Sequence, residues 1–412
     1  VFRTYKYRLY PTRVQEKTLD FLLMQGRLIY NDALEQRLKV YRETGESVSY
    51  PQQWAHFRDL RHAHPDTLGR LNATSVQQIL RRLDKAFKAF FRRLKAGEKP
   101  GFPRFKGCNR FNSLEYRYGD GCKLRFSGGR ARFYVQNVGE IKVKYHRPLP
   151  EGAQIKHVIL KRRNRRWYIC LMLELPEPAV IKEHPGPAVG IDVGLHHLLA
   201  LSNGETVDNP RWLRRSLAKL RVAQRRMARR LKGSRGWREA AYQVARLHER
   251  IAHQRRDFWH KFTRKLVDTY SLVVLEDLNL AFMTANSHLA LSAHDAGLAE
   301  FRQLLAYKAE SAGTRVVFVN PAFTSQLCSF CGAVVVKDLS VRVHECSFCG
   351  YTADRDVNAA RNILSSVAVK SAWTGPPGVL GHGVAVPVQR ASPGKLPALA
   401  GRVVTCAPFG VK

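Results

Sequence analysis

Two short cysteine runs with the same pattern place the tightest limit on this chain. Cys328-Ser-Phe-Cys331-Gly is followed by Cys346-Ser-Phe-Cys349-Gly, with 14 residues between Cys331 and Cys346. Each C-x-x-C-G run predicts a tight turn that points two sulfurs at one site, and the glycine permits the backbone turn. Two such turns supply the four thiolates of a tetrahedral structural Zn2+. We therefore expect a zinc ribbon over 321–352, with no open coordination position for catalysis.

The remaining cysteines do not suggest a disulfide framework. The chain has eight cysteines, and the four outside these runs share no spacing. Two disulfides are the alternative to zinc, but this pattern suits a reducing cytosol with one metal site better. Phe330 and Phe348 are expected to pack inside the ribbon. His344 is either a spare ligand or, as the favoured interpretation, a surface histidine.

Charge is the second constraint. The 412 residues include 69 Lys and Arg against 33 Asp and Glu, a formal net charge of +36 that is spread along the chain. A field of this size attracts polyanions, so nucleic acid is the first candidate partner. No run of about 18 apolar residues is present, and no apolar segment follows a basic start. Neither a membrane-spanning helix nor a secretory signal is therefore expected, and the predicted location is the cytoplasm.

Hydrophobic patterns divide the first half of the chain. Residues 1–9 predict a strand, and 111–178 contains short alternating runs at the spacing of a small β-barrel. Between them, 10–110 is mainly helical. An amphipathic helix over 72–94 has a basic second face, which is either a solvated surface or, beside the overall charge, a phosphate-contacting one.

The second half reads as a separate domain. A proline-rich linker over 179–187 leads into an α/β pattern over 188–320 and 353–367. The pattern is interrupted by a basic helical arm, 211–268, whose first 50 residues hold 16 Lys and Arg against three acids. Helices this basic are expected to lie along a nucleic-acid backbone. The tail, 368–412, is rich in Gly and Pro and is expected to be disordered.

Acidic residues within apolar runs are the third feature. Asp192 lies in Val-Gly-Ile-Asp-Val-Gly and Glu276 in Leu-Val-Val-Leu-Glu, where burial of a charge is costly without a counter-charge. Asp354 and Asp356 directly precede a helix, which either could simply cap. For one acid alone the structural role is favoured. Three together in a basic protein indicate Mg2+ or Mn2+, and two such ions about 4 Å apart support phosphodiester hydrolysis.

The order of these motifs resembles the split RuvC domain of TnpB proteins, relatives of the type V CRISPR effectors. GIDVG, VVLEDL, the C-x-x-C pair and DRDVNAARNI follow one another, and YKYRLYPT, FKAFFRRLKAG and PGFPRFK are similar to the family's N-terminal motifs. The resemblance extends to about Val367. It implies catalytic and Mg2+-binding roles for Asp192, Glu276 and Asp356. Asp356 is preferred to Asp354 because it directly precedes the Val-Asn-Ala-Ala helix.

The resemblance also implies an α/β multidomain fold. An RNase-H-like (RuvC) nuclease domain with a helical insert and the zinc ribbon stands beside an N-terminal β-barrel, the wedge, with inserted recognition helices. A guide RNA from the element's own transcript and a double-stranded DNA target with a short flanking motif are the implied partners, in a prokaryotic cytoplasm, associated with the nucleoid. A further set of polar and basic residues has two interpretations, either as ordinary surface residues or as contacts to nucleic acid. These residues are Tyr50, Asn72, Thr74, Gln77, Arg81, Lys85, Arg225 and Arg229.

Three other functions stay open. A guided repressor would bind DNA without cutting it, and the acidic triad argues against it. A transposase that joins strands uses the same class of fold, so the fold alone does not decide. A junction resolvase would need neither the N-terminal region nor this charge excess. The sequence does not determine the oligomeric state, the guide sequence or the flanking motif.

Overall fold

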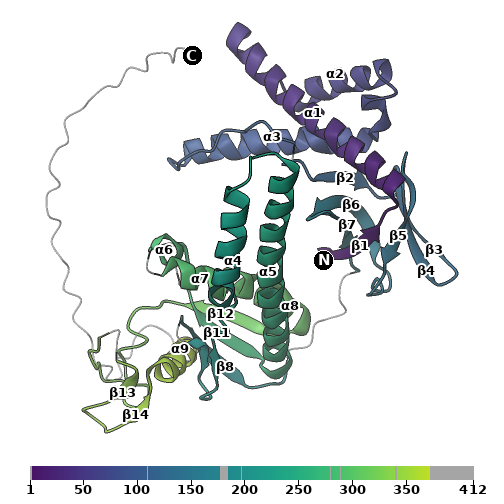
Figure 1. Cartoon of the computed structure of the whole chain (residues 1–412). Coiled ribbons are helices and arrows are strands. Elements are labelled where there is room, and N and C mark those ends of the chain that lie inside the picture. The colour runs from purple at the N-terminus through teal and green to yellow at the C-terminus, as the bar shows by residue number, and fades with distance from the viewer. Residues whose placement is uncertain are drawn as a thin grey trace, which may run out of the picture.

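The chain forms two lobes, each with its own sheet and apolar core (Figure 1). The predicted tail from 372 onward and the predicted linker up to 183 lie outside the part of the chain that can be described. No helix within that part is long and apolar enough to cross a membrane. The computed structural model describes residues 2–108, 110–176, 184–195, 197–278, 280–287, 289–338 and 341–371.

The N-terminal lobe is built on a seven-stranded antiparallel sheet with the order β2-β6-β7-β1-β5-β4-β3. The first strand of the chain lies in the middle of the sheet, between β5 and β7. The predicted strands are confirmed, but no ladder joins the end strands β2 and β3 within the described residues, so closure into a barrel stays a prediction. The strands are β1 (Phe2–Tyr10), β2 (Ser113–Arg117), β3 (Cys122–Ser127), β4 (Arg130–Val135), β5 (Gly139–Lys144), β6 (Gln154–Arg163) and β7 (Arg166–Glu174).

Helices α1 (Arg13–Thr44), α2 (Tyr50–Ala63) and α3 (Ala73–Lys95) are inserted between β1 and β2, together with the short η1 (Leu68–Arg70). The helical insert that the sequence predicts is thus present. Gly26 lets α1 approach the sheet, because a Cβ there would stand 2.8 Å from the ring of Phe111. The first half of α3 is buried, but its second half projects from the core with Phe91 51% exposed.

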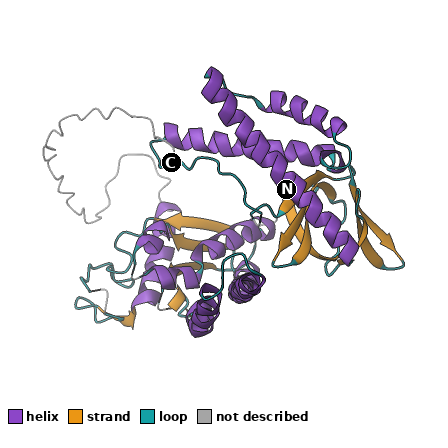
Figure 2. Ribbon diagram, turned by 45° about the horizontal axis from the view of Figure 1, so that its top comes forward, coloured by secondary structure: helices purple, strands orange, loops and turns teal. Residues whose placement is uncertain are grey.

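The C-terminal lobe contains a five-stranded mixed sheet with the order β10-β9-β8-β11-β12, in which β8, β11 and β12 are parallel (Figure 2). Helix α9 lies directly on β8, since a Cβ on Gly190 would stand 2.1 Å from the carbonyl oxygen of Ala360. The strands are β8 (Ala188–Val193), β9 (His197–Leu201), β10 (Thr206–Asp208), β11 (Leu272–Glu276) and β12 (Arg315–Val319), with β13 (Val343–Glu345) and β14 (Thr352–Asp354) in the cysteine segment. The helices are α4 (Trp212–Ala228), α5 (Arg235–Thr269), α6 (Leu280–Ala285), α7 (Ala290–Ala296), α8 (Leu298–Ala312) and α9 (Arg355–Ser371).

The basic arm is the helix pair α4–α5, which rises from the C-terminal lobe toward α3 (Figure 1). The hairpin between β6 and β7 reaches α5 through ion pairs. Arg163 lies 3.5 Å from Glu249, and Arg165 lies 2.7 Å from Glu239. Two of the arm's few acids therefore face the N-terminal lobe, which leaves the rest of its surface strongly basic.

Candidate active site

The fold brings Asp192 and Glu276 to the same edge of the C-terminal sheet. They lie near the carboxyl ends of β8 and β11, neighbouring parallel strands in which Ile191 is opposite Leu275. Asp356 enters from the first turn of α9, which packs on β8. The three acids that the sequence singled out thus come from segments 80 or more residues apart and meet at one place.

The surroundings of these carboxyls shift their pKa values. Burial, followed by the neighbouring Glu276 and Asp356, raises the pKa of Asp192 to about 8. Burial also raises the pKa of Glu276, which is 6% exposed, while a hydrogen bond from the Thr324 hydroxyl opposes that rise. Arg342 is 4.0 Å from Asp356 and half-exposed, so it offers little compensation. The raised pKa of Asp192 means that this buried carboxyl keeps its proton at neutral pH, because its charged form would be poorly solvated and would lie beside other acids.

Asp354 has a different role from Asp356. Its Oδ1 accepts the backbone N–H groups of Asp356 at 2.9 Å and Val357 at 3.1 Å, and so caps the N-terminus of α9. The helix-capping interpretation therefore applies to Asp354. The Asp356 carboxyl lies close enough to Asp192 to contribute to the raised pKa of that acid.

The four cysteines form a second cluster. Their sulfurs all lie within 4.8 Å of one another, and Cys328–Cys349 and Cys331–Cys346 are separated by 3.8 and 3.6 Å. Zn–S bonds of about 2.3 Å in a tetrahedron require sulfur separations of about 3.8 Å, so the cluster fits Zn2+. The thiols are free, which excludes the disulfide alternative in this structure.

Glycines shape both turns, as expected. Gly332 and Gly350 have φ of 77° and 72°, and their N–H groups donate to the carbonyls of Cys328 and Cys346, each at 2.9 Å. A side chain at either position would be strained in this left-handed conformation. The local sequence is therefore sufficient to build each pair of ligands.

Two expectations about the ribbon were wrong. Phe330 and Phe348 are each 74% exposed, because the sulfurs occupy the inside of so small a unit and the third position of each turn faces outward. Phe330 instead stacks on Tyr351 at 5.8 Å. His344 is fully buried rather than at the surface, beside Lys337 and Tyr351, and it is not part of the sulfur cluster.

Three side chains that the sequence did not single out join the ribbon to the acids. The Thr324 hydroxyl donates to the Glu276 carboxylate. Asn358 accepts the N–H of Ser329 at 2.9 Å, and both Asn358 and Asn362 donate to the carbonyl of Leu327 at 2.7 Å. The available signal was the i, i+4 spacing of the two asparagines in DVNAARN, which places their amides on one face of α9.

The predicted DNA-reading residues of the helical insert have internal partners. Asn72 caps α3 by accepting the N–H of Thr74 at 2.8 Å, and its amide donates to Asp120 and Gln136, each at 3.0 Å. The Thr74 hydroxyl donates to Asp120 as well. Both residues are buried, so a structural role accounts for them here, and a role in reading DNA stays a prediction. Tyr50 lies 5.5 Å from the guanidinium of Arg81, and Gln77 is half-buried.

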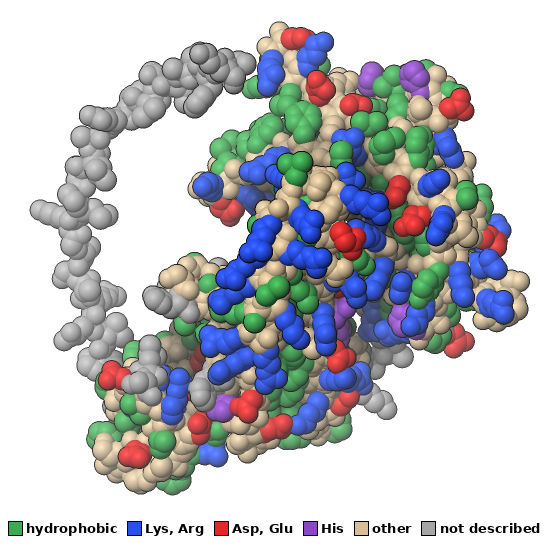
Figure 3. Space-filling model, viewed as in Figure 1, with side chains coloured by type: hydrophobic (Ala, Val, Ile, Leu, Met, Phe, Trp, Pro, Cys, Tyr) green, Lys and Arg blue, Asp and Glu red, His purple; other side chains and the backbone are tan. Residues whose placement is uncertain are grey.

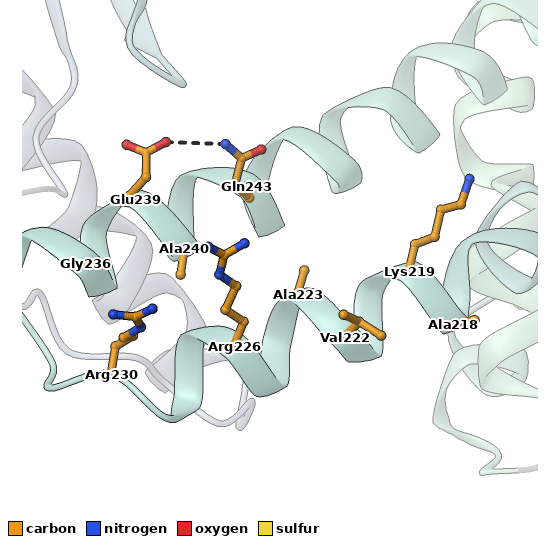
Figure 4. A pocket seen from close by; sticks show the side chains of 10 residues that line it. All are labelled: Ala218, Lys219, Val222, Ala223, Arg226, Arg230, Gly236, Glu239, Ala240 and Gln243. Atoms are coloured by element: carbon orange, nitrogen blue, oxygen red, sulfur yellow. Dashed lines mark hydrogen bonds between the residues drawn. The ribbon is translucent and has the colours of Figure 1, made fainter.

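The predicted phosphate-contacting residues lie at the surface. Lys85, Arg225 and Arg229 are exposed, and basic side chains gather over α4 and α5 on the face in Figure 3. A groove of about 730 Å³ separates the outer ends of these helices, with Arg226 of α4 and Arg230 of the turn after it reaching toward α5 (Figure 4). An apolar floor with a cationic rim of this kind suits a polyanion better than a small neutral ligand.

Comparison with known proteins now decides the family. A 117-residue stretch, 171–287, matches the IS605 OrfB family, described as "Probable transposase", and residues 299–363 match the Cas12f1-like TNB domain. A "Putative RNA-guided DNA endonuclease" of Streptomyces pristinaespiralis is 37% identical, over 90% of this chain and 91% of its own. The chain belongs to the TnpB family. InsQ of Escherichia coli, a TnpB relative with the same description, is 30% identical over 88% of this chain and 92% of its own.

Solved structures support the same fold for this TnpB protein. The Cas12f1 chain from a complex with guide RNA and target DNA superposes with a TM-score of 0.57, over 88% of this chain and 98% of that one, at 15% identity. Residues 1–46 match a profile named a helix-turn-helix domain. In this structure that segment contains β1 and the single long helix α1 instead.

Proposed function

We propose that this TnpB protein is a metal-dependent DNA endonuclease guided by an RNA from its own insertion sequence. The observation that carries the proposal is the convergence of Asp192, Glu276 and Asp356 at one sheet edge in a chain of this family. The S. pristinaespiralis and E. coli relatives, which align over nearly their whole lengths, are described as RNA-guided DNA endonucleases. In this proposal the C-terminal lobe is the RuvC nuclease domain.

Oxygen ligands from three carboxyls fit Mg2+ or Mn2+, the hard cations. When bound, such ions supply Lewis acidity and an activated water for phosphodiester hydrolysis. The chain's own residues hold the acids in place: the strand register sets Asp192 beside Glu276, and the cap by Asp354 fixes the turn that carries Asp356. A bound cation would restore ionisation of Asp192 at neutral pH, because it offsets the burial and the repulsion that together raise the pKa of this carboxyl.

The remaining assignments belong to the same proposal. The N-terminal sheet corresponds to the wedge and α1–α3 to the recognition helices. Arg81, Lys85 and the α4–α5 arm with Arg225 and Arg229 contact phosphates of the guide RNA or of its duplex with the target. Base pairing then gives the sequence specificity, and the protein reads a short flanking motif. The four cysteines hold a structural Zn2+, and the protein acts in the cytoplasm at the nucleoid of a prokaryote.

The test is recovery of the guide. The protein is expressed with its native flanking DNA, purified, and the RNA that copurifies is sequenced. One abundant RNA with a constant scaffold and a variable end is expected, and with it Mg2+-dependent cleavage of a matching DNA. Random cellular fragments would refute guided action and favour an unguided nuclease or a transposase. A specific RNA without cleavage under any divalent ion would favour the guided repressor.

A further inference from the structure

The segment that leads from β12 into the cysteine cluster lies against the acids as well as against α9. It begins with Phe323, a non-glycine residue with φ of 65°, followed by Thr324, which is 8% exposed. A left-handed conformation is unfavourable for such a residue, so its surroundings must hold it. The carbonyl of Thr324 accepts the amide of Asn362 at 2.8 Å, which ties this segment to α9.

The backbone at Glu276 is held by hydrogen bonds from another helix, α8. Arg302 of α8 donates to the carbonyl oxygen of Glu276 and, at 3.2 Å, to that of Leu278. The side-chain rotamer of Glu276 is then the remaining freedom of this acid. The hydroxyl of Thr324 donates to its Oε1 and so selects one rotamer.

The Thr324 hydroxyl has one hydrogen to donate and two acceptors within reach. Besides the carboxylate of Glu276, the carbonyl of Pro321 lies 3.2 Å from the Thr324 oxygen. A bond to an ionised carboxylate is shorter and about twice as strong as one to a neutral carbonyl. The hydroxyl therefore stays on Glu276 when that acid is ionised, which is the state that a cation needs.

From these contacts we infer that Thr324 is a positioning residue for Glu276 and that, through residues 324–329, the cysteine cluster sets the geometry of the acidic site. A second connection runs through Asn358, which lies two residues after Asp356 in α9. Its amide accepts the N–H of Ser329 and donates to the carbonyl of Leu327. Residues 324–329 thus contact Glu276 directly and also hold the first turns of α9, the helix that carries Asp356. This inference rests on the proposed nuclease function and adds a coupling between its two metal sites.

The test compares Thr324→Val, which keeps the shape and removes the hydroxyl, with Thr324→Ser, which keeps the hydroxyl. Full-length protein with its guide RNA is assayed for single-turnover cleavage, and the full-length chain is titrated with Mn2+ by electron paramagnetic resonance. Loss of a group that orients a metal ligand costs about 10-fold to 100-fold in affinity or rate. We expect Thr324→Val to lose that much in both measurements and Thr324→Ser to recover most of it, with zinc content and target binding unchanged.

A double-mutant cycle separates positioning from general damage. In a Glu276→Gln background, Thr324→Val should not weaken Mn2+ binding further, because the hydroxyl acts through this carboxylate. Equal Mn2+ affinities for Thr324→Val and the wild type would overturn the inference, as would loss of zinc from Thr324→Val or failure of Thr324→Ser to recover. A wild-type chain that neither binds Mn2+ at the acids nor cuts would instead overturn the proposed function.

Discussion

The two candidate metal sites of the C-terminal lobe are built in opposite ways. The four cysteines come from two turns with the same sequence pattern, within a segment of 22 residues, and their sulfurs lie within 4.8 Å of one another. The acids come from two strands and a helix, and within the described residues they do not form so tight a group. Local sequence therefore assembles the first site, whereas the second depends on the whole lobe.

The two sites should therefore affect the stability of the fold in opposite directions. A closed cluster of thiolates adds the free energy of metal binding to the free energy of folding. A cluster of buried acids does the reverse, because their mutual repulsion opposes folding until a cation binds. The ribbon site should therefore behave as part of the fold, and the acidic site as a strained element that the fold supports.

Asp192→Asn is expected to have the largest effect on activity. It keeps the shape of the side chain but removes an anionic ligand, so guided cleavage should fall on the order of 10³-fold or more. Guide RNA and target DNA affinities should stay unchanged, since the phosphate contacts that we propose lie on other residues. Quantitative cleavage and filter-binding assays on the same preparations check both points. Loss of target binding together with cleavage would show that Asp192 supports the fold rather than the chemistry.

Cys346→Ser should affect the fold first. One ligand fewer should release the zinc and unfold the ribbon, which lowers the melting temperature and, through Thr324 and Asn358, weakens Mn2+ binding at the acids. Zinc analysis and thermal melts measure the first effect, and Mn2+ titration the second. Cys108→Ser is the matched control, because this exposed thiol lies outside the cluster. A zinc-free Cys346→Ser protein with wild-type stability would contradict the structural role of the metal.

The same contrast explains what could be predicted from the sequence. The cysteines were predictable because their spacing alone defines the site. Asp192 and Glu276 were predictable because acids within apolar strands are unusual, although only strand register brings them together. The burial of Asn72 and Thr74 was not, since their partners Asp120 and Gln136 lie 46 to 64 residues away.

The ribbon also shows where local reasoning fails. Phe330 was expected inside because it is apolar, but a unit whose centre is filled by four sulfurs has no room for a phenyl ring. His344 was expected outside because it is polar, yet it lies fully buried beside Lys337. In so small a unit, geometry around the ligands decides burial more than residue type does.

The pH dependence of stability should separate the two sites in the absence of Mg2+ and Mn2+. The pKa of Asp192 is about 8 in the folded chain, against an ordinary value of 3.8. The folded chain thus keeps a proton that the unfolded chain releases, so its stability falls as pH rises from about 4 to about 8 and then levels off. Thermal melts of the zinc-loaded protein across this range should show a steeper fall for the wild type than for Asp192→Asn. Parallel curves would contradict the raised pKa.

Asp295→Asn offers the smallest effect and the strictest control. This acid is 2% exposed, like the acids of the site, but both its oxygens accept backbone N–H groups at the start of α4, from Leu213 at 2.8 Å and Arg214 at 3.1 Å. Asparagine keeps one accepting oxygen but turns the other into an NH2 group facing a backbone N–H, so the replacement should cost about 1–2 kcal/mol of folding free energy. Faster amide hydrogen exchange in the first turn of α4 would locate that loss.

The affinity for Mn2+ should not change in Asp295→Asn, because this carboxylate is already used by the backbone of α4. A drop in Mn2+ affinity as large as that of Asp192→Asn would mean that any buried acid of this lobe influences the ion by way of the fold. The effect of Asp192→Asn would then not show that Asp192 is a metal ligand. If Asp295→Asn instead loses stability but keeps its Mn2+ affinity, the difference between Asp192 and Asp295 is explained by metal binding at Asp192.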